Sequence, residues 1–293
     1  MWFFFASLTA FFEACKDATG KQSLKTLDEY SVLFGLMAVG SVILLPVLLL
    51  TGLPPIQPSF WLAIVIGGSL NILAFTLYVR ALKLADLSLT VPLVTLTPLF
   101  LLVTSPLLVQ EWPTWADGIG VILLVVGSYV LNMNALNIGT GLSQSPFEPL
   151  FIMARNPGSR LMLCVAFIWS ITSNFDKIGV VNSSPLLWAV ALFGTIAGGM
   201  VPFVFFRKGR GGIVLLKDQW RLLGITGAFN AIAITFQMVA LTLAPVAQVI
   251  AVKRMSALLS VLFGHFFFGE KGLKERLLGA AIMVSGVVIM ALR

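Results

Sequence analysis

The chain has 293 residues, of which 58% are hydrophobic and only 11% are charged. Soluble domains carry about 25% charged residues, so this composition excludes an ordinary soluble protein and indicates an integral membrane protein. The formal net charge of +7 comes from Lys and Arg in short clusters between apolar segments, a pattern that indicates membrane topology and does not predict nucleic-acid binding.

Ten apolar segments follow one another along the chain, and most are close to the ~20 residues that cross a bilayer as an α-helix. The connections between them are short, except for one near the middle of the chain. We therefore predict an all-α membrane protein with ten transmembrane helices. The predicted helices are 2–20, 30–51, 59–80, 88–109, 114–133, 160–180, 185–206, 220–242, 247–268 and 274–292.

An internal repeat relates the two halves, because adding 159 to a residue number in the first half reaches a matching residue in the second half without a gap. Chance matches between apolar sequences involve Leu and Val, whereas these pairs include Trp, Asn, Asp, Glu and Gly in one register. We predict two five-helix repeats, at 1–133 and 160–293, joined by a connector at 134–159. The pairs include Trp61/Trp220, Gly68/Gly227, Asn71/Asn230, Glu111/Glu270, Gly120/Gly279, Gly127/Gly286 and Asp17/Asp176.

Because each repeat has an odd number of crossings, the second repeat is expected to be inverted in the membrane relative to the first. Inverted repeats are a transporter architecture, in which the substrate site lies near the membrane midplane and the halves rock to alternate access. The sequence thus predicts two inverted five-helix repeats.

The distribution of Lys and Arg predicts the orientation in the membrane. The connections after the predicted second, fourth and eighth helices contain no Lys or Arg, and the connection after the sixth has only Lys177 at its helical edge, whereas the connections on the other side hold 14 of the 19 Lys and Arg residues. The positive-inside rule therefore places both termini outside the cytoplasm.

Several motifs in corresponding places of the two halves carry a family resemblance. The stretch ALKLADLS at 81–88 corresponds to ALTLAPVA at 240–247. Further signs are the fourth helix of each half with Thr97-Pro98 or Ser256, a glutamate at its end, a glycine-spaced fifth helix, and SNFDKIGV at 173–180. Each half resembles an EamA domain of the drug/metabolite transporter (DMT) superfamily. The resemblance implies a central cavity and transport of small organic metabolites, often as export. Many members place their termini in the cytoplasm, unlike the orientation predicted here.

Two cations lie inside the predicted ninth helix. Lys253 and Arg254 are ~10 Å from its start at a rise of 1.5 Å per residue, and their first-half counterparts are Val94 and Thr95, so duplication alone does not explain them. An ionisable group at the membrane centre costs about 2.5–3.5 kcal/mol and usually faces a cavity or a partner. Lys253 and Arg254 are therefore candidates to bind an anionic group of the substrate, such as a carboxylate or phosphate. The alternatives are a structural ion pair with a carboxylate of the first or sixth helix, or snorkelling to the interface.

Further charges occur in the predicted first and sixth helices. Glu13, Lys16 and Asp17 have the spacing that places all three on one helical face, and Asp176 and Lys177 are adjacent in the sixth helix. Intramembrane carboxylates can relay protons, which would couple transport to a proton gradient. The alternative is that these groups lie near helix ends, solvated or paired with one another.

Polar side chains of the predicted third and eighth helices are further candidates for substrate binding. Asn71 and Asn230 form a repeat-related pair, and Tyr78 and Gln237 each follow by seven residues, two turns along the same face. The asparagines can instead bond between helices, and their repetition favours that structural role.

Prolines and glycines predict local features of the helices. Pro92, Pro98 and Pro106 predict a bent fourth helix, because each removes a backbone donor. Glycines spaced by seven residues on the fifth and tenth helices predict close helix packing.

The function that these features favour is a secondary transporter, with an exporter as the expected direction and a small organic metabolite, anionic or zwitterionic, as the substrate. An intramembrane enzyme would need a convergent catalytic set, and no HExxH, GxSxG or phosphate-binding loop occurs, so no enzyme activity, catalytic residue or cofactor is expected. The single histidine and two cysteines predict no metal site. A non-transporting receptor or scaffold is the remaining alternative.

The protein is expected in the plasma or inner membrane, as a multi-pass protein in the lipid bilayer. A homodimer is compatible with the sequence, and no nucleic-acid partner is expected.

Overall fold

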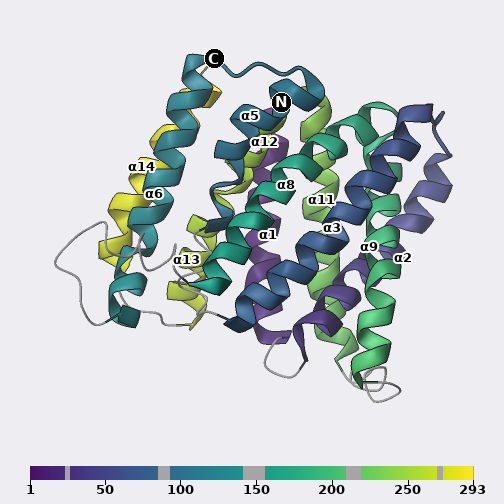
Figure 1. Cartoon of the computed structure of the whole chain (residues 1–293), viewed down its shortest axis with the longest axis horizontal. Coiled ribbons are helices and arrows are strands. Elements are labelled where there is room, and N and C mark those ends of the chain that lie inside the picture. The colour runs from purple at the N-terminus through teal and green to yellow at the C-terminus, as the bar shows by residue number, and fades with distance from the viewer. Residues whose placement is uncertain (24–26, 85–92, 141–155, 209–218, 269–272, 293) are drawn as a thin grey trace. The chain divides into compact units, whose positions relative to one another are not determined.

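The computed structural model describes residues 1–23, 27–84, 93–140, 156–208, 219–268 and 273–292, and these residues form α-helices and their connections, with no strand among them (Figure 1). Eleven helices occur in this part of the chain, and counting α12 and α13 as one interrupted helix leaves one for each predicted segment. The helices are α1 (Trp2–Ser23), α2 (Glu29–Thr51), α3 (Pro58–Leu84), α5 (Thr97–Val109), α6 (Trp115–Thr140), α8 (Pro157–Val181), α9 (Pro185–Lys208), α11 (Trp220–Leu243), α12 (Val246–Lys253), α13 (Ser256–Phe268) and α14 (Leu273–Ala291).

Several helices begin where the sequence carries a start signal. Pro58, Pro157 and Pro185 are the first residues of α3, α8 and α9, positions at which the missing amide N–H of proline costs nothing. The α2 helix begins after Asp28, whose carboxylate accepts hydrogen bonds from the Ser31 N–H at 3.1 Å and the Ser31 hydroxyl at 2.8 Å.

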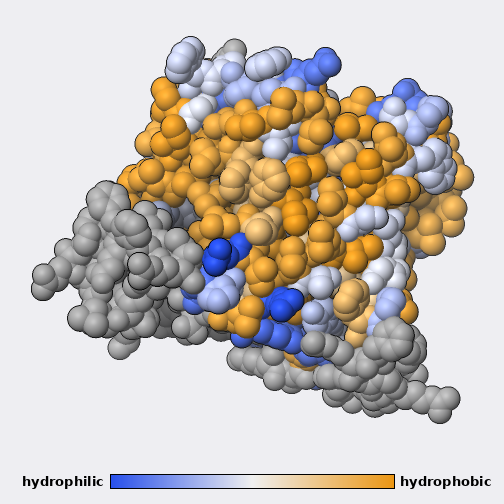
Figure 2. All heavy atoms as spheres, viewed as in Figure 1, coloured by the Kyte–Doolittle hydropathy of each residue, from blue (hydrophilic) through white to orange (hydrophobic). Residues whose placement is uncertain are grey.

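Five of the described helices are long and apolar enough to cross a membrane by length and composition: α2, α3, α8, α9 and α11. Shorter apolar helices occur at Thr97–Val109, Trp115–Leu131 and Leu278–Ala291. Apolar side chains cover much of the face drawn in Figure 2, and large hydrophobic side chains such as Leu50, Leu107 and Trp115 are highly exposed in the chain. Such exposure is expected of a surface that contacts lipid.

The chain divides into two compact units, and each unit draws on both halves of the sequence. Unit 1 consists of residues 1–72 and 175–244, and unit 2 of residues 73–174 and 245–293. In unit 1, α1 packs along α11, and α2 packs against α9 and α11. In unit 2, α6 packs along α14, and α5 contacts α12. The helices α3 and α8 each contribute residues to both units.

Phenylalanine rings line the contact of α1 with α11 in unit 1. The ring of Phe12 lies 6.2 Å from that of Phe229 and 6.0 Å from that of Phe236, and Phe5 lies 5.9 Å from Phe236. The residues on each helix are seven apart, so the rings follow one face of each helix.

Glycines allow the backbones of α6 and α14 to pack closely in unit 2, where the two helices lie side by side (Figure 1). A Cβ atom added to Gly120 would lie 2.6 Å from the Gly286 carbonyl oxygen, and one added to Gly127 would lie 2.7 Å from the Gly279 carbonyl oxygen. Because higher numbers on α6 face lower numbers on α14, the two helices are antiparallel. The predicted packing role of these four glycines is confirmed.

The same contacts follow the internal repeat. Under the offset of 159, Gly120 corresponds to Gly279 and Gly127 to Gly286, so the contact between α6 and α14 maps onto itself. This is the self-complementary pattern of a two-fold interface.

Unit 1 contains a comparable pair of contacts. A Cβ atom on Gly68 would meet the Thr195 side chain, and one on Gly227 would meet the Val39 side chain and the Leu36 carbonyl oxygen. Gly68 corresponds to Gly227 and Leu36 to Thr195 under the offset of 159. Repeat-related residues therefore make related contacts in both units.

Some helix edges differ from the predicted ones. The α6 helix continues to Thr140, past the predicted end at 133, and α8 begins at Pro157. Most of the predicted connector, and the start of the predicted helix 88–109, lie outside the described residues.

Candidate functional site

The fourth and ninth predicted helices are interrupted at repeat-related positions. A turn at Thr95 and Leu96 precedes α5, and a turn at Arg254 and Met255 separates α12 from α13. Under the offset of 159, Thr95 corresponds to Arg254 and Leu96 to Met255, so both interruptions fall at the same point of the repeat. Pro98 lies in the first turn of α5, where its missing N–H is tolerated, and Pro92 lies outside the described residues.

The interruption of the ninth helix was not predicted. The residue that corresponds to Pro98 is Ala257, so no proline marks the break in the second half. The position of this break places Lys253 in the last turn of α12 and Arg254 at the C-cap of α12. The negative end of the helix dipole stabilises cations at this position, which gives the two charges a physical reason to lie inside an apolar segment.

Arg254 is held by two side chains of unit 2. Its Nη2 atom donates to the Thr97 hydroxyl at 3.0 Å, and that hydroxyl donates to the Val94 carbonyl oxygen at 2.7 Å. The Arg254 guanidinium also lies over the ring of Trp169 on α8, with Cζ 6.0 Å from the ring centroid. This distance is at the limit for a cation–π interaction. The plane and direction of the guanidinium are thus restrained by a hydroxyl at the start of α5 and an indole on α8.

Trp169 also links Arg254 to another predicted site residue, Tyr78. The Trp169 ring lies 5.5 Å from the ring of Tyr78 and 5.7 Å from that of Phe75, both on α3. Trp169 was not among the predicted site residues. A usable signal was that its first-half counterpart is Ala10, so, like Arg254, Trp169 departs from the repeat.

A polar group connects α5 and α8 in the same unit. The Asn174 amide Nδ2 donates to the Thr104 hydroxyl at 3.1 Å and to the Ser170 carbonyl oxygen at 2.8 Å. Asn174 is fully buried, and Thr104 and Ser170 are also buried. This connection lies two turns along α5 from Thr97, on the same helical face.

The amino end of α12 is held by two acidic residues, one in the connection between α5 and α6 and one in the first turn of α6. The Glu111 carboxylate accepts from the Val246 N–H at 2.7 Å, and the buried Asp117 carboxylate accepts from the Gln248 side chain at 2.7 Å. Glu111 thus supplies an acceptor to an N–H in the first turn of a helix far along the chain. Its repeat partner, Glu270, lies outside the described residues.

The remaining polar candidates belong to unit 1. Asn71 donates from its side chain to the Gly67 carbonyl oxygen at 3.0 Å, one turn back in α3. Asn230 and Gln237 are buried on α11, two turns apart, and the Asn230 Nδ2 atom has no hydrogen-bond partner among the described residues. These three residues are therefore in a different unit from Arg254, Lys253 and Tyr78.

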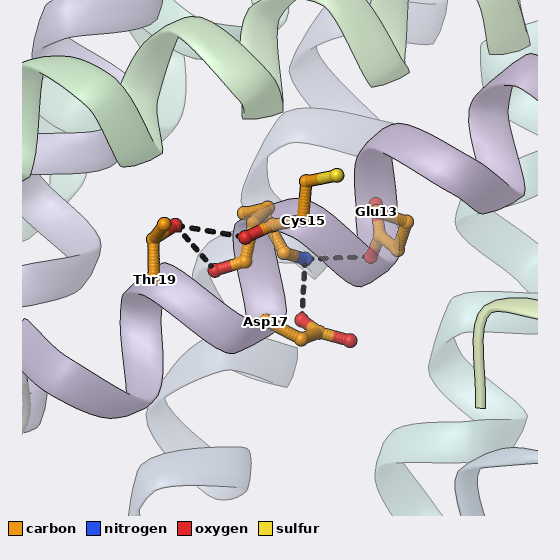
Figure 3. A network of polar contacts seen from close by, with 5 residues as sticks. Glu13, Cys15, Asp17 and Thr19 are labelled. Atoms are coloured by element: carbon orange, nitrogen blue, oxygen red, sulfur yellow. Dashed lines mark hydrogen bonds and ion pairs between the residues drawn. The ribbon is translucent and has the colours of Figure 1, made fainter. Parts of the chain in front are cut away.

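The charges of α1 pair with one another, as Figure 3 shows for this helix. Lys16 Nζ lies 2.6 Å from a Glu13 carboxylate oxygen and 3.3 Å from an Asp17 carboxylate oxygen. Thr19, one turn further, donates its hydroxyl to the Cys15 and Lys16 carbonyl oxygens. The pairing agrees with the alternative in which these charges stabilise one another.

Asp176 and Lys177 make separate contacts in unit 1. The Trp188 indole Nε1 donates to the Asp176 carboxylate at 3.0 Å, and both side chains are buried. Lys177 donates to the Ala244 carbonyl oxygen at 2.9 Å, at the carboxyl end of α11, where a cation is favoured. Among the described residues, no group of three or more His, Cys, Asp or Glu side chains is placed to hold a metal ion.

Comparisons with known proteins agree with the helical, repeated architecture. The model of the EamA-like transporter family matches residues 1–133 and 156–292. One solved crystal structure, described only as that of a protein, superposes with a TM-score of 0.74 at 19% identity, and the match covers 98% of this chain and 97% of that chain. At this identity the likeness shows the fold alone. No curated protein matches the sequence. The family match extends over nearly the whole chain in two parts, and the chain therefore belongs to the EamA-like transporter family of multi-pass membrane proteins.

Proposed function

We propose that this protein is a secondary transporter that moves small organic anions or zwitterions across the cell membrane by alternating access, with Arg254 binding the anionic group. Membership of a transporter family gives the general activity. The substrate class, the mechanism and the direction are the proposal, and the family resemblance favours export. The observation that carries the substrate class is the guanidinium held by Thr97 and Trp169 at the interruption of the ninth helix.

Inverted repeats with ten crossings are the architecture that we propose for alternating access. The antiparallel, self-complementary contact of α6 with α14 supports inversion, because a two-fold rotation that exchanges antiparallel helices has its axis perpendicular to them. If these helices cross the bilayer, that axis lies in the membrane plane, as in other transporters with inverted repeats.

The interrupted helices support a binding function at the same place. Interruptions at membrane depth are tolerated where they are buried in protein or line a water-filled cavity, and transporters use them to bind substrates. Here the two interruptions are brought together through the bond between Arg254 and Thr97. A guanidinium at this point can donate in a fork to a carboxylate or phosphate.

Lys253 is proposed as a second positive charge at this site. It lies beside Arg254 at the carboxyl end of α12 and is partly buried. Tyr78, in contact with Trp169, is proposed to line the same site. Asn71, Asn230 and Gln237 stay as candidates for polar contacts elsewhere along the pathway.

The experiment is flux in proteoliposomes. Labelled amino acids, sugar phosphates and uncharged nucleosides are supplied to purified protein, and uptake and efflux are measured separately to give the direction. We expect transport of the charged classes and none of the nucleosides. Removing a hydrogen bond to a charged group costs about 1.5–3 kcal/mol, so Arg254→Met should lower kcat/KM about 10–100-fold.

Arg160→Met is the matched control, because Arg160 is also in unit 2 but is exposed at the start of α8. It should leave transport unchanged. Lys253→Met should weaken transport in the same direction as Arg254→Met. If both Lys253→Met and Arg254→Met insert into membranes and transport normally, the proposed site is wrong.

A further inference from the structure

The buried amide of Asn174 has a defined orientation. Its Nδ2 atom donates to the Ser170 carbonyl oxygen at 2.8 Å and to the Thr104 hydroxyl at 3.1 Å. A carbonyl oxygen can only accept, so a rotated amide would place two acceptors against each other. The network therefore fixes the Oδ1 atom of Asn174 on the side away from Ser170.

That Oδ1 atom is a buried acceptor with no hydrogen-bond partner among the described residues, and the Asn174 side chain is 0% exposed. The hydroxyl of Ser105, next to Thr104 on α5, is likewise buried and unpartnered in the described part of the chain. Buried polar atoms without partners are uncommon, and each one needs an explanation.

The Asn174 Oδ1 atom can only accept, so a partner for it has to be a donor. An unpartnered buried acceptor therefore favours a ligand group that donates hydrogen bonds, and an ammonium group donates three.

Asn174 and Arg254 are anchored to the same two helices in unit 2. On α5, Thr97 contacts Arg254 and Thr104 contacts Asn174, and these residues are seven apart on one face, a rise of ~10 Å. On α8, Trp169 contacts Arg254 and is five residues from Asn174, a rise of ~7.5 Å. The cation and the unpartnered acceptor are thus offset by about 7–10 Å along the helices.

We propose that Asn174 Oδ1 is a second substrate-binding point, which accepts a hydrogen bond from an ammonium group displaced by about 7–10 Å along the helices from the anionic group held by Arg254. The substrate class is then a bifunctional compound, anionic at one end and aminated at the other. This inference rests on the proposed function and specifies its substrate.

The test uses two series of probes on the purified full-length protein. The first contains 4-aminobutanoate, 6-aminohexanoate and 8-aminooctanoate, and the second contains the same acids without the amino group. Binding is measured directly, by calorimetry or by a shift of the melting temperature. We expect one of the longer amino acids to bind about 10–100-fold more tightly than its unaminated match, as expected for a hydrogen bond to a charged group.

Asn174→Leu should abolish the advantage of the amino group and leave the unaminated acid unchanged. Asn174→Ser keeps a donor on the Asn174 side of the Ser170 carbonyl oxygen and lacks the amide oxygen, so it should also abolish the advantage, and it covers the case in which the leucine variant fails to fold. Asn182→Ala is the matched control, since Asn182 follows the last residue of α8 and belongs to unit 1, outside the proposed site. Its side chain makes the same kind of bond, to the Ile178 carbonyl oxygen four residues back, at 2.7 Å.

The outcomes separate this inference from the proposed function. Arg254→Met should weaken both series, and if it weakens neither, the anion site is wrong whatever Asn174 does. The Asn174 proposal is overturned if no amino acid of the series binds better than its match, including the case in which neither series binds, or if Asn174→Leu keeps the advantage.

Discussion

The contact of α6 with α14 predicts that an added methyl group at Gly127 will separate two backbones. A Cβ atom there would lie 2.6 Å from the Met283 amide nitrogen and 2.7 Å from the Gly279 carbonyl oxygen, whereas ordinary contacts begin near 3.4 Å. The helices must therefore move apart by roughly 0.8 Å, and neither clashing atom is the end of a flexible side chain. Overpacking of this kind costs about 1–3 kcal/mol, which is a factor of about 5–150 in the folding equilibrium.

The assay is reversible unfolding of the purified protein in mixed micelles, with SDS as the denaturant and helix content as the signal. Gly118→Ala is the control on the same helix, because a Cβ atom at Gly118 meets nothing within 4 Å. Alanine is also the better helix former, so Gly118→Ala should be neutral or stabilising. Gly127→Ala should unfold at lower SDS than the wild type.

The double variant Gly127→Ala/Gly279→Ala should cost less than the sum of the single variants. Either methyl group alone already separates the helices at the same contact, and neighbouring substitutions are not additive. If Gly127→Ala is as stable as Gly118→Ala, the close packing of the two backbones is incorrect.

Three further predictions concern stability and orientation. Trp188→Phe removes the indole donor to the buried Asp176 and should destabilise the fold by about 1–3 kcal/mol in the same unfolding assay, and equal stability would show that the bond contributes nothing. Glu111→Gln weakens the acceptor for the Val246 N–H and should increase amide hydrogen exchange in the first turn of α12, with Glu29→Gln at the start of α2 as the control. A C-terminal reporter that is active only in the cytoplasm should stay silent, since the distribution of Lys and Arg places the C-terminus outside, and activity would refute that orientation.

The helical architecture could be predicted because membrane-length apolar segments and proline starts are local features of the sequence. The glycine contact between α6 and α14 was also predictable, since Gly120 and Gly127 recur at the same offset as their counterparts. The exact ends of the helices were less predictable. The α6 helix runs to Thr140, because apolar and small residues continue past the predicted end.

The site was only partly predictable. Arg254 is visible from sequence because a cation in an apolar segment needs an explanation, but its partners Thr97 and Trp169 depend on packing between helices remote in sequence. No proline marks the break before Ser256. Only the correspondence of the ninth helix with the fourth under the internal repeat could have indicated this break. Glu13 and Asp17 pair with Lys16, and the spacing of the three residues in the sequence is compatible with this pairing. The same spacing is equally compatible with a proton relay.

The central claim is that the two repeats have opposite orientations in the membrane, and the repeat-related tryptophans Trp61 and Trp220 test it most directly. Both are exposed at the starts of their helices. Single Trp61→Cys and Trp220→Cys variants are made in a background that lacks Cys15 and Cys164, and a membrane-impermeant maleimide is added to intact cells and to opened membranes. Inverted repeats predict that the two positions are labelled from opposite sides. With the orientation that the distribution of Lys and Arg gives, the cysteine at 61 is labelled in intact cells and the cysteine at 220 only after the membranes are opened. Labelling of both positions from the same side would contradict the account.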